Sequence, residues 1–182
     1  MSAARVRAAI QTLEGTIVFT DIVGFTEFTA LRGDEAALNL LSIQERIVSE
    51  RISSHGRIVK ELGDGLMLWF DDPCQAVAAC LALQERFEQE AVSRDLPLWV
   101  RVGVHYGRPA QRGGDLIGHD VNVAARMVDL AAPGEVLASD ATVQAIGDGL
   151  PQVQFEEVGP TVMKGIPAPV PLFRAVARLA AA

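Results

Sequence analysis

The order of strand and helix patterns along the chain restricts its fold more than any other feature of the sequence. Short β-branched runs alternate with two long stretches in which apolar residues recur at helical spacing. The strand patterns cover residues 16–21, 57–62, 66–70 and 98–106, and the helical patterns cover residues 34–54 and 73–92. This β-α-β-β-α-β order is typical of a ferredoxin-like core.

The strand pattern at 98–106, LWVRVGVHY, alternates strictly. Val100, Val102 and Val104 fall on one face, and Arg101 and His105 fall on the other. One face of the sheet therefore packs into a core. We expect helices on that side and an open face on the other.

The second half of the chain predicts an α/β subdomain added to this core. A polar link, GRPAQRGG at 107–114, leads to an Ala-rich helix that ends at Pro133 and Gly134. Strand patterns follow at EVLAS, QVQFEEV and VPLFRAV. We expect an α+β fold with one domain at 15–176, a short helical extension or linker at 1–14 and a tail at 177–182.

Charge and composition exclude several classes of function. The 182 residues are 49% hydrophobic, which suffices for one sizeable core, and the net charge of −7 disfavours nucleic acid or an anionic membrane as partner. No apolar run could span a membrane and no secretion signal is visible, so we expect a cytoplasmic protein. Cys74 and Cys80 are predicted to be small buried apolar residues.

Two carboxylates stand where strands end. Asp21 closes FTD and is followed by Gly24, Phe25 and Thr26, a glycine loop whose backbone N–H groups could bind phosphate. Asp64 lies in the GDG turn between two strands and could converge on Asp21 if those strands are neighbours. Two such carboxylates could hold two divalent ions for phosphoryl transfer. A helix cap and an ordinary Asp-Gly turn remain the alternatives.

A third polar group follows in DLIGHDVNVAAR. The four-residue spacing places Asn122 and Arg126 on one helix face, so both can reach one ligand, with Asp115 just upstream. A solvated polar face is the alternative interpretation.

Together, FTDIVGFT, K-x-x-GDG and D-x-x-G-x-x-VN-x-AAR resemble the catalytic domain of class III adenylyl and guanylyl cyclases. The link between His105 and Asp115 is short, as in a bacterial adenylyl cyclase subgroup with a reduced dimerisation arm. The resemblance implies two Mg²⁺ or Mn²⁺ ions on Asp21 and Asp64, and ATP cyclised to cyclic AMP. It further implies that Asn122 and Arg126 position the transition state. VMKGIPAPVPLFRAV resembles the family's closing segment and implies that Lys164 contacts phosphate.

Lys60 and Asp115 are the base readers that the resemblance implies. Lysine only donates hydrogen bonds and aspartate only accepts them, which matches N1 and the N6 amino group of adenine and opposes guanine. In guanylyl cyclases the resemblance leads one to expect Glu and a small residue at these positions. It also implies a homodimer whose sites take residues from both chains.

Several alternatives remain. The chain could be a guanylyl cyclase, a cyclase with loose base choice, or a non-catalytic nucleotide-binding dimer. GGD at 113–115 suggests a diguanylate cyclase, which we set aside because the run is expected in a link and not at a hairpin tip. We expect structural roles for the three histidines, His55, His105 and His119, and buried core positions for the two tryptophans, Trp69 and Trp99.

Overall fold

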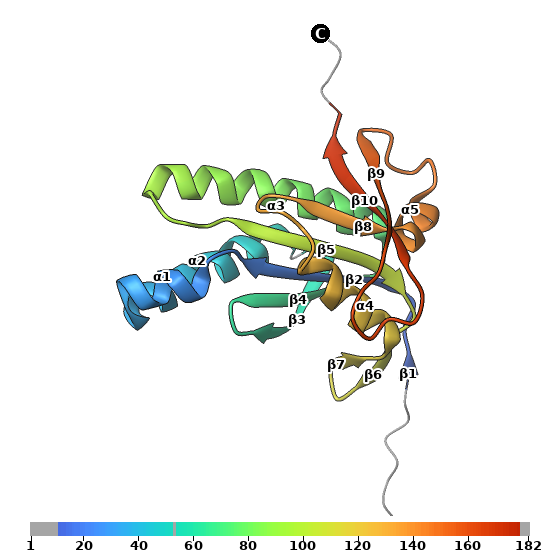
Figure 1. The fold of residues 1–182 in the computed structure, drawn as a ribbon, viewed down its shortest axis with the longest axis horizontal. Coiled ribbons are helices and arrows are strands. Elements are labelled where there is room, and N and C mark those ends of the chain that lie inside the picture. The colour runs from blue at the N-terminus through green and yellow to red at the C-terminus, as the bar shows by residue number, and fades with distance from the viewer. Residues whose placement is uncertain (1–10, 53, 179–182) are drawn as a thin grey trace, which may run out of the picture.

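The computed structural model describes residues 11–52 and 54–178, built around a seven-stranded sheet in the order β3-β4-β2-β5-β8-β10-β9 (Figure 1). A small sheet, β1-β6-β7, lies beside it. The strands are β1 (Gln11–Thr12), β2 (Gly15–Ile22), β3 (Gly56–Leu62), β4 (Gly65–Phe70), β5 (Val100–Gly107), β6 (Ala110–Arg112), β7 (Asp115–Ile117), β8 (Val136–Ser139), β9 (Val153–Thr161) and β10 (Val170–Ala177). The helices are α1 (Phe25–Arg32), α2 (Asp34–Ile52), α3 (Pro73–Arg94), α4 (His119–Val128) and α5 (Asp140–Ile146).

The ferredoxin-like core expected from the sequence is confirmed. Strands β3, β4, β2 and β5 are neighbours, and every pair among them is antiparallel. The four strands and two helices predicted for this core begin and end within two residues of the observed β2, α2, β3, β4, α3 and β5. The helix predicted to end at Pro133 ends earlier, at Val128, and β9 extends three residues beyond the predicted strand QVQFEEV. The added α/β part contributes β8, β10 and β9, with β8 parallel to β5.

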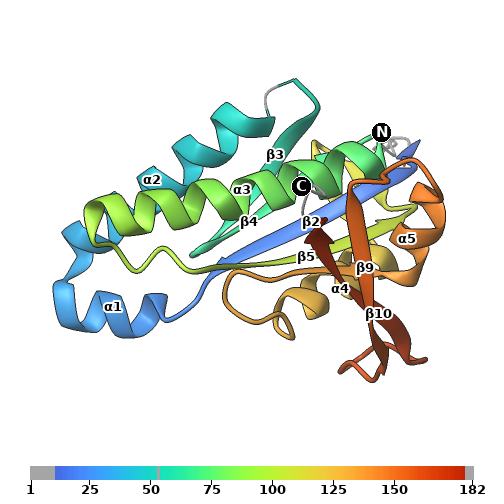
Figure 2. The same cartoon turned by 90° about the horizontal axis from the view of Figure 1, so that it is seen from above.

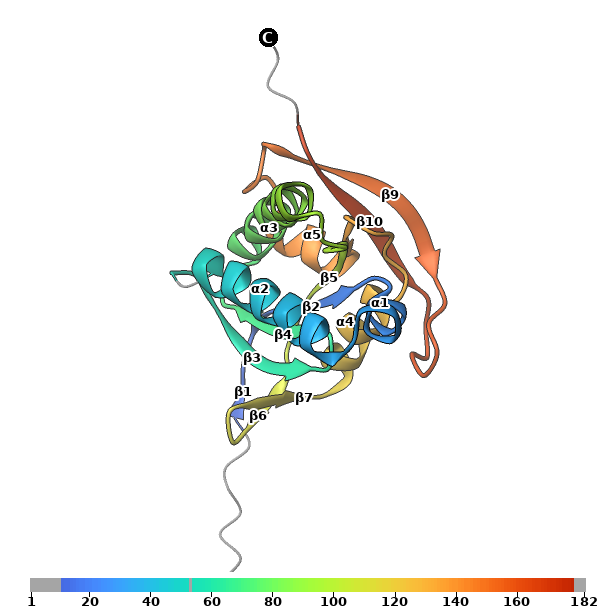
Figure 3. The same ribbon diagram turned by 90° about the vertical axis from the view of Figure 1, so that its left-hand side faces the viewer.

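Both faces of the sheet are covered, so the expectation of one open face was wrong. Helices α2 and α3 pack on one face over residues such as Val18 and Val102 (Figure 2). On the other face, Ile17 and Met67 pack against Val121 and Ala124 of α4 (Figure 3). The sequence predicts helix α4 as part of the added subdomain, so its packing on this face of the sheet was not expected.

The polar link predicted at 107–114 is mostly a hairpin. Strands β6 and β7 pair through Arg112 and Asp115, and Gly113 and Gly114 form the turn with positive φ. GGD therefore does lie at a hairpin tip, and the reason given against a diguanylate cyclase was wrong. Glycines at a two-residue turn are a hairpin signal that polar composition concealed.

Other departures are local. Residues 11–12 form β1 where a short helix was expected, and residues 1–10 of that segment lie outside the described part of the chain. Cys80 and Trp69 are buried as expected, whereas Cys74 is half-buried and Trp99 is 49% exposed. Trp99 immediately precedes β5, on the side of the alternating pattern that also carries Arg101. None of the described helices is long and apolar enough to cross a membrane.

A buried carboxylate joins α2 to α3. The Glu90 side chain is 4% exposed and forms ion pairs with Arg46 at 3.0 Å, Arg86 at 2.9 Å and Arg94 at 2.6 Å. Because this charge is out of water, removing it while the arginines remain costs more than breaking an exposed ion pair.

Glu90→Gln is expected to lower the free energy of unfolding by about 2 kcal/mol, because an amide cannot satisfy three guanidinium groups. Thermal unfolding followed by circular dichroism measures this loss. Glu88→Gln, an exposed change on the same helix, is the matched control and should leave the midpoint unchanged. Equal midpoints for both variants would contradict a stabilising role of this cluster.

Candidate active site

Asp21 and Asp64 converge at one end of the sheet. Asp21 lies opposite Gly65 in the β2–β4 pair, and Asp64 immediately precedes Gly65 in the turn after β3. Burial and the negative charge of Asp21 together raise the pKa of the Asp64 carboxyl. Two carboxylates are thus held close enough to repel each other, which favours a bound cation between them.

Arg101 is a further residue of this site that sequence reasoning missed. In the β2–β5 pair it lies opposite Asp21. Its Nε donates to Oδ2 of Asp21 at 2.7 Å, and its Nη2 lies 2.7 Å from the same oxygen as an ion pair. The alternating pattern had put Arg101 on the polar face of β5. Only the register of β2 against β5, which the sequence does not state, connects it to Asp21.

Helix α4 brings a second arginine to the edge of this cluster. A Cβ at Gly103 would lie 2.8 Å from the backbone nitrogen of Val128, so only glycine lets α4 approach β5 this closely. The Asp129 side chain then lies between two arginines, 3.7 Å from Nη2 of Arg101 and 3.8 Å from Nη1 of Arg126. Nη1 of Arg101 also donates to the Asp129 carbonyl at 3.1 Å.

Lys60 and Asp115 meet from different strands. Nζ of Lys60 on β3 lies 2.8 Å from Oδ2 of Asp115 on β7, and Oδ1 of Asp115 accepts from the Leu116 backbone N–H at 2.7 Å. The Lys60 hydrogen bond holds the pKa of the Asp115 carboxyl below its usual value. A donor and an acceptor are therefore presented side by side, both partly exposed.

The predicted residues form separate groups within one chain. Among the described residues, no side-chain hydrogen bond or ion pair joins Asn122 or Arg126 to Asp21, Lys60 or Asp115. Both α4 residues are exposed. One chain thus offers a carboxylate cluster, a base-reading pair and two exposed α4 side chains, with no direct side-chain contact between these groups among the described residues.

The predicted phosphate contacts lie in two places. Gly24 adopts a left-handed φ of 75° and precedes α1, with no side-chain cap, so the first N–H groups of the helix at Phe25 and Thr26 point outward. Lys164 is exposed in a turn between β9 and β10.

The sequence model of the adenylate and guanylate cyclase catalytic domain matches residues 9–173. The chain belongs to this family. It is 33% identical over 175 residues to a pH-sensitive adenylate cyclase of Mycobacterium tuberculosis, covering 92% of this chain and 43% of that protein. The chain therefore spans less than half the length of that curated relative.

Solved structures agree on the fold of this cyclase domain. The adenylyl cyclase CyaB from P. aeruginosa is 26% identical, with a TM-score of 0.82, covering 94% of this chain and 98% of that one. The guanylyl cyclase Cya2 is 24% identical, with a TM-score of 0.79, covering 94% and 95%. The fold is thus shared by adenylyl and guanylyl cyclases, and base choice must be argued from Lys60 and Asp115.

The carboxylate cluster suits a hard divalent cation. Across residues 11–52 and 54–178, no three His, Cys, Asp or Glu side chains gather into a metal site. Two carboxylates are nevertheless what Mg²⁺ takes from a protein when substrate phosphates and water complete its shell. Asp21 and Asp64 therefore fit the cations, provided that Arg101 gives up its contact with Oδ2 of Asp21.

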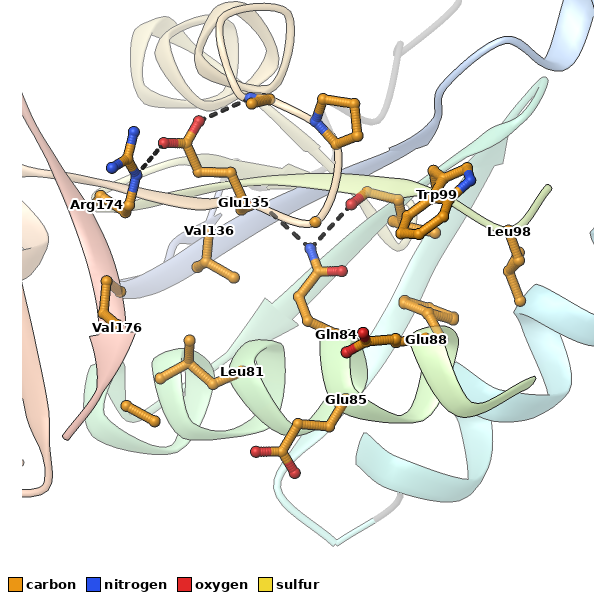
Figure 4. Close-up of a pocket in the computed structure, with 17 residues that line it drawn as sticks. Leu81, Gln84, Glu85, Glu88, Leu98, Trp99, Glu135, Val136, Arg174 and Val176 are labelled. Atoms are coloured by element: carbon orange, nitrogen blue, oxygen red, sulfur yellow. Dashed lines mark hydrogen bonds and ion pairs between the residues drawn. The ribbon is translucent and has the colours of Figure 1, made fainter. Parts of the chain in front are cut away.

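A hollow of about 530 Å³ elsewhere in the cyclase domain is not part of this site (Figure 4). It lies between α3, the segment before β8, and β10, and none of the predicted site residues lines it. Gln84 lines this hollow, and its side-chain amide donates to the carbonyls of Val100 at 3.0 Å and Glu135 at 3.3 Å. Exposed Trp99 forms part of its wall.

His105 anchors the start of α4, as its predicted structural role requires. Its Nδ1 lies 2.8 Å from the Ser139 hydroxyl and its Nε2 lies 3.5 Å from Asp120, whose other oxygen accepts from the Arg108 backbone at 2.6 Å. Burial lowers the pKa of His105 and outweighs the opposing effect of Asp120. The imidazole is thus neutral in the folded cyclase domain at neutral pH.

The free energy of unfolding is expected to fall between pH 7 and pH 5 because of His105, by at most about 2 kcal/mol, the limit for a histidine that stays neutral in the folded state. Below the ordinary histidine pKa of about 6.5 the unfolded chain binds a proton that folded His105 resists, so acid favours unfolding. Urea unfolding across this range measures the slope. His105→Gln should remove that part of the slope, while the exposed control His55→Gln should retain it; an unchanged slope in His105→Gln would refute the assignment.

Proposed function

We propose that this cyclase domain converts ATP to 3′,5′-cyclic AMP and pyrophosphate. The observation that carries the proposal is the contact between Lys60 and Asp115 at 2.8 Å. The ammonium keeps donors free beside the carboxylate, and Oδ2 keeps a lone pair. This donor next to an acceptor complements N1 and the N6 amino group of adenine. Guanine would instead place its N1–H donor against Lys60 and its O6 acceptor against Asp115.

Asp21 and Asp64 would hold the two divalent cations, Mg²⁺ or Mn²⁺. When bound, the cations neutralise the phosphates and lower the pKa of the ribose 3′ hydroxyl that attacks the α-phosphorus. Arg126 would donate to the α-phosphate as it gains charge, and Asn122 would orient the ribose. The N–H groups after Gly24, together with Lys164, would bind the leaving phosphates.

We infer that the active site is shared across a homodimer. This inference is supported by the exposure of Asn122 and Arg126 and by the lack, among the described residues, of a direct side-chain contact from either of them to Asp21, Lys60 or Asp115. A two-fold pairing would bring the carboxylates of one protomer to the base-reading pair and α4 of its partner, and would generate two equal sites. A domain that uses ATP would work in the cytoplasm.

The proposal is tested by incubating the domain with ATP and Mn²⁺ and measuring cyclic AMP by chromatography. GTP is assayed in parallel, with Asp21→Asn as the inactive reference. We expect cyclic AMP from ATP, with turnover of GTP at least tenfold slower. Faster cyclisation of GTP would overturn the base assignment, and no product from either nucleotide would favour a non-catalytic role.

A further inference from the structure

The two oxygens of the Asp21 carboxylate differ in their surroundings. Oδ2 accepts from Nε of Arg101 at 2.7 Å and also lies 2.7 Å from its Nη2. No hydrogen bond or ion pair from the described residues reaches Oδ1. A cation can therefore bind Oδ1 together with Asp64 while Arg101 stays in place. A second cation that binds Asp21 through Oδ2 would have to displace Arg101 from it.

Arg101 has a second acceptor within reach. Its Nη1 already donates to the backbone carbonyl of Asp129 at 3.1 Å, and its Nη2 lies 3.7 Å from Oδ1 of that side chain. Oδ2 of Asp129 faces Arg126 at 3.8 Å, so Oδ1 is available without displacing Arg126. If the guanidinium of Arg101 keeps its contact with the Asp129 carbonyl, a small movement takes Nη2 from the carboxylate of Asp21 to the carboxylate of Asp129.

We propose that Arg101 blocks the second cation position on Asp21 and that Asp129 receives Arg101 when this position fills. The inference rests on the proposed function, since it concerns the same two-cation site. Asp129 is on this account a positioning residue that acts through Arg101. The cations bind in order, the first on Oδ1 and Asp64, and the second only after Arg101 has moved.

Mn²⁺ binding in the absence of nucleotide tests the proposal without any turnover. Free Mn²⁺ is counted by electron paramagnetic resonance during titration of the whole domain. We expect a first ion that is lost in Asp21→Asn and a weaker second ion. Arg101→Gln should strengthen the second ion by about tenfold, because the blocking charge is gone. Asp129→Asn should weaken it by about threefold to tenfold, because Arg101 then remains on Asp21.

The double variant separates transfer of Arg101 from a simple charge effect. If Asp129 acts only by receiving Arg101, Asp129→Asn has no effect on the second ion once Arg101→Gln is present. If Asp129 acts only as a nearby negative charge, Asp129→Asn weakens binding of the second ion equally with and without Arg101→Gln, and the proposal is wrong. Asp148→Asn, an exposed charge change on the segment after α5, is the matched control and should change nothing.

Each remaining outcome has a definite meaning. A second ion that binds wild type and Arg101→Gln equally, or no Mn²⁺ binding that depends on Asp21, overturns the proposal. Circular dichroism of each variant verifies that it is folded. Cyclic AMP formation by the wild type is scored separately: its absence would refute the proposed function, while its presence with a failed double-variant test would refute only the role of Asp129.

Discussion

Replacement of Arg126 by alanine is expected to lower the turnover number for cyclic AMP formation by about 10³–10⁵, with a much smaller change in KM. The guanidinium would act on charge that develops only in the transition state, as an arginine finger does. Arg126→Lys should also fail, because an ammonium lacks the planar fork. The measurement is steady-state turnover of ATP with saturating Mn²⁺. Retention of more than a tenth of the wild-type rate would remove Arg126 from the reaction.

Mixing variants tests where Arg126 acts. Asp21→Ala and Arg126→Ala are each expected to be inactive, yet their heterodimer keeps one site with Asp21 from one protomer and Arg126 from its partner. An equal mixture that exchanges freely should recover about one quarter of the wild-type rate, since half the dimers hold one intact site. The matched control is Asp21→Ala with Asp64→Ala, which should recover nothing. Equal results from both mixtures would contradict a shared site.

The convergence of Asp21 and Asp64 could be predicted because it depends on local patterns. A β-branched run ending in Asp21 and a GDG turn between two strands fix where the carboxylates stand. The ferredoxin-like order then makes β2 and β4 neighbours. The placement of Asn122 and Arg126 on one helix face could be predicted equally well, because it follows from helical spacing alone.

What could not be predicted depends on register and packing between distant segments. Arg101 contacts Asp21 because β5 pairs with β2 in one particular register, and a shift of one residue would turn it to the other face. Asp129 joins the cluster only because Gly103 lets α4 lie close to β5. The β6–β7 hairpin, which presents Asp115 to Lys60, was hidden in a polar run whose strands are only three residues long.

The pairing of Lys60 with Asp115 leads to the second large effect, a reversal of base choice. The double variant Lys60→Glu with Asp115→Ser is expected to change the ratio of kcat/KM for ATP over GTP by about 10²–10⁴ in favour of GTP. The donor at position 60 becomes an acceptor and the acceptor at position 115 becomes a donor. Each group left unpaired costs about 1–3 kcal/mol. Glutamate accepts from N1–H of guanine, and the serine hydroxyl donates to O6.

The single variants show why both changes are needed. In Lys60→Glu the new carboxylate lies against Asp115, so the two like charges repel and both nucleotides should react slowly. Arg57→Glu makes the same charge change on β3 away from this pair, and it should keep the wild-type preference. Competition between ATP and GTP in one tube measures the ratio directly. A double variant that still prefers ATP would mean that adenine is recognised elsewhere and that the Lys60–Asp115 ion pair only ties β3 to the β6–β7 hairpin.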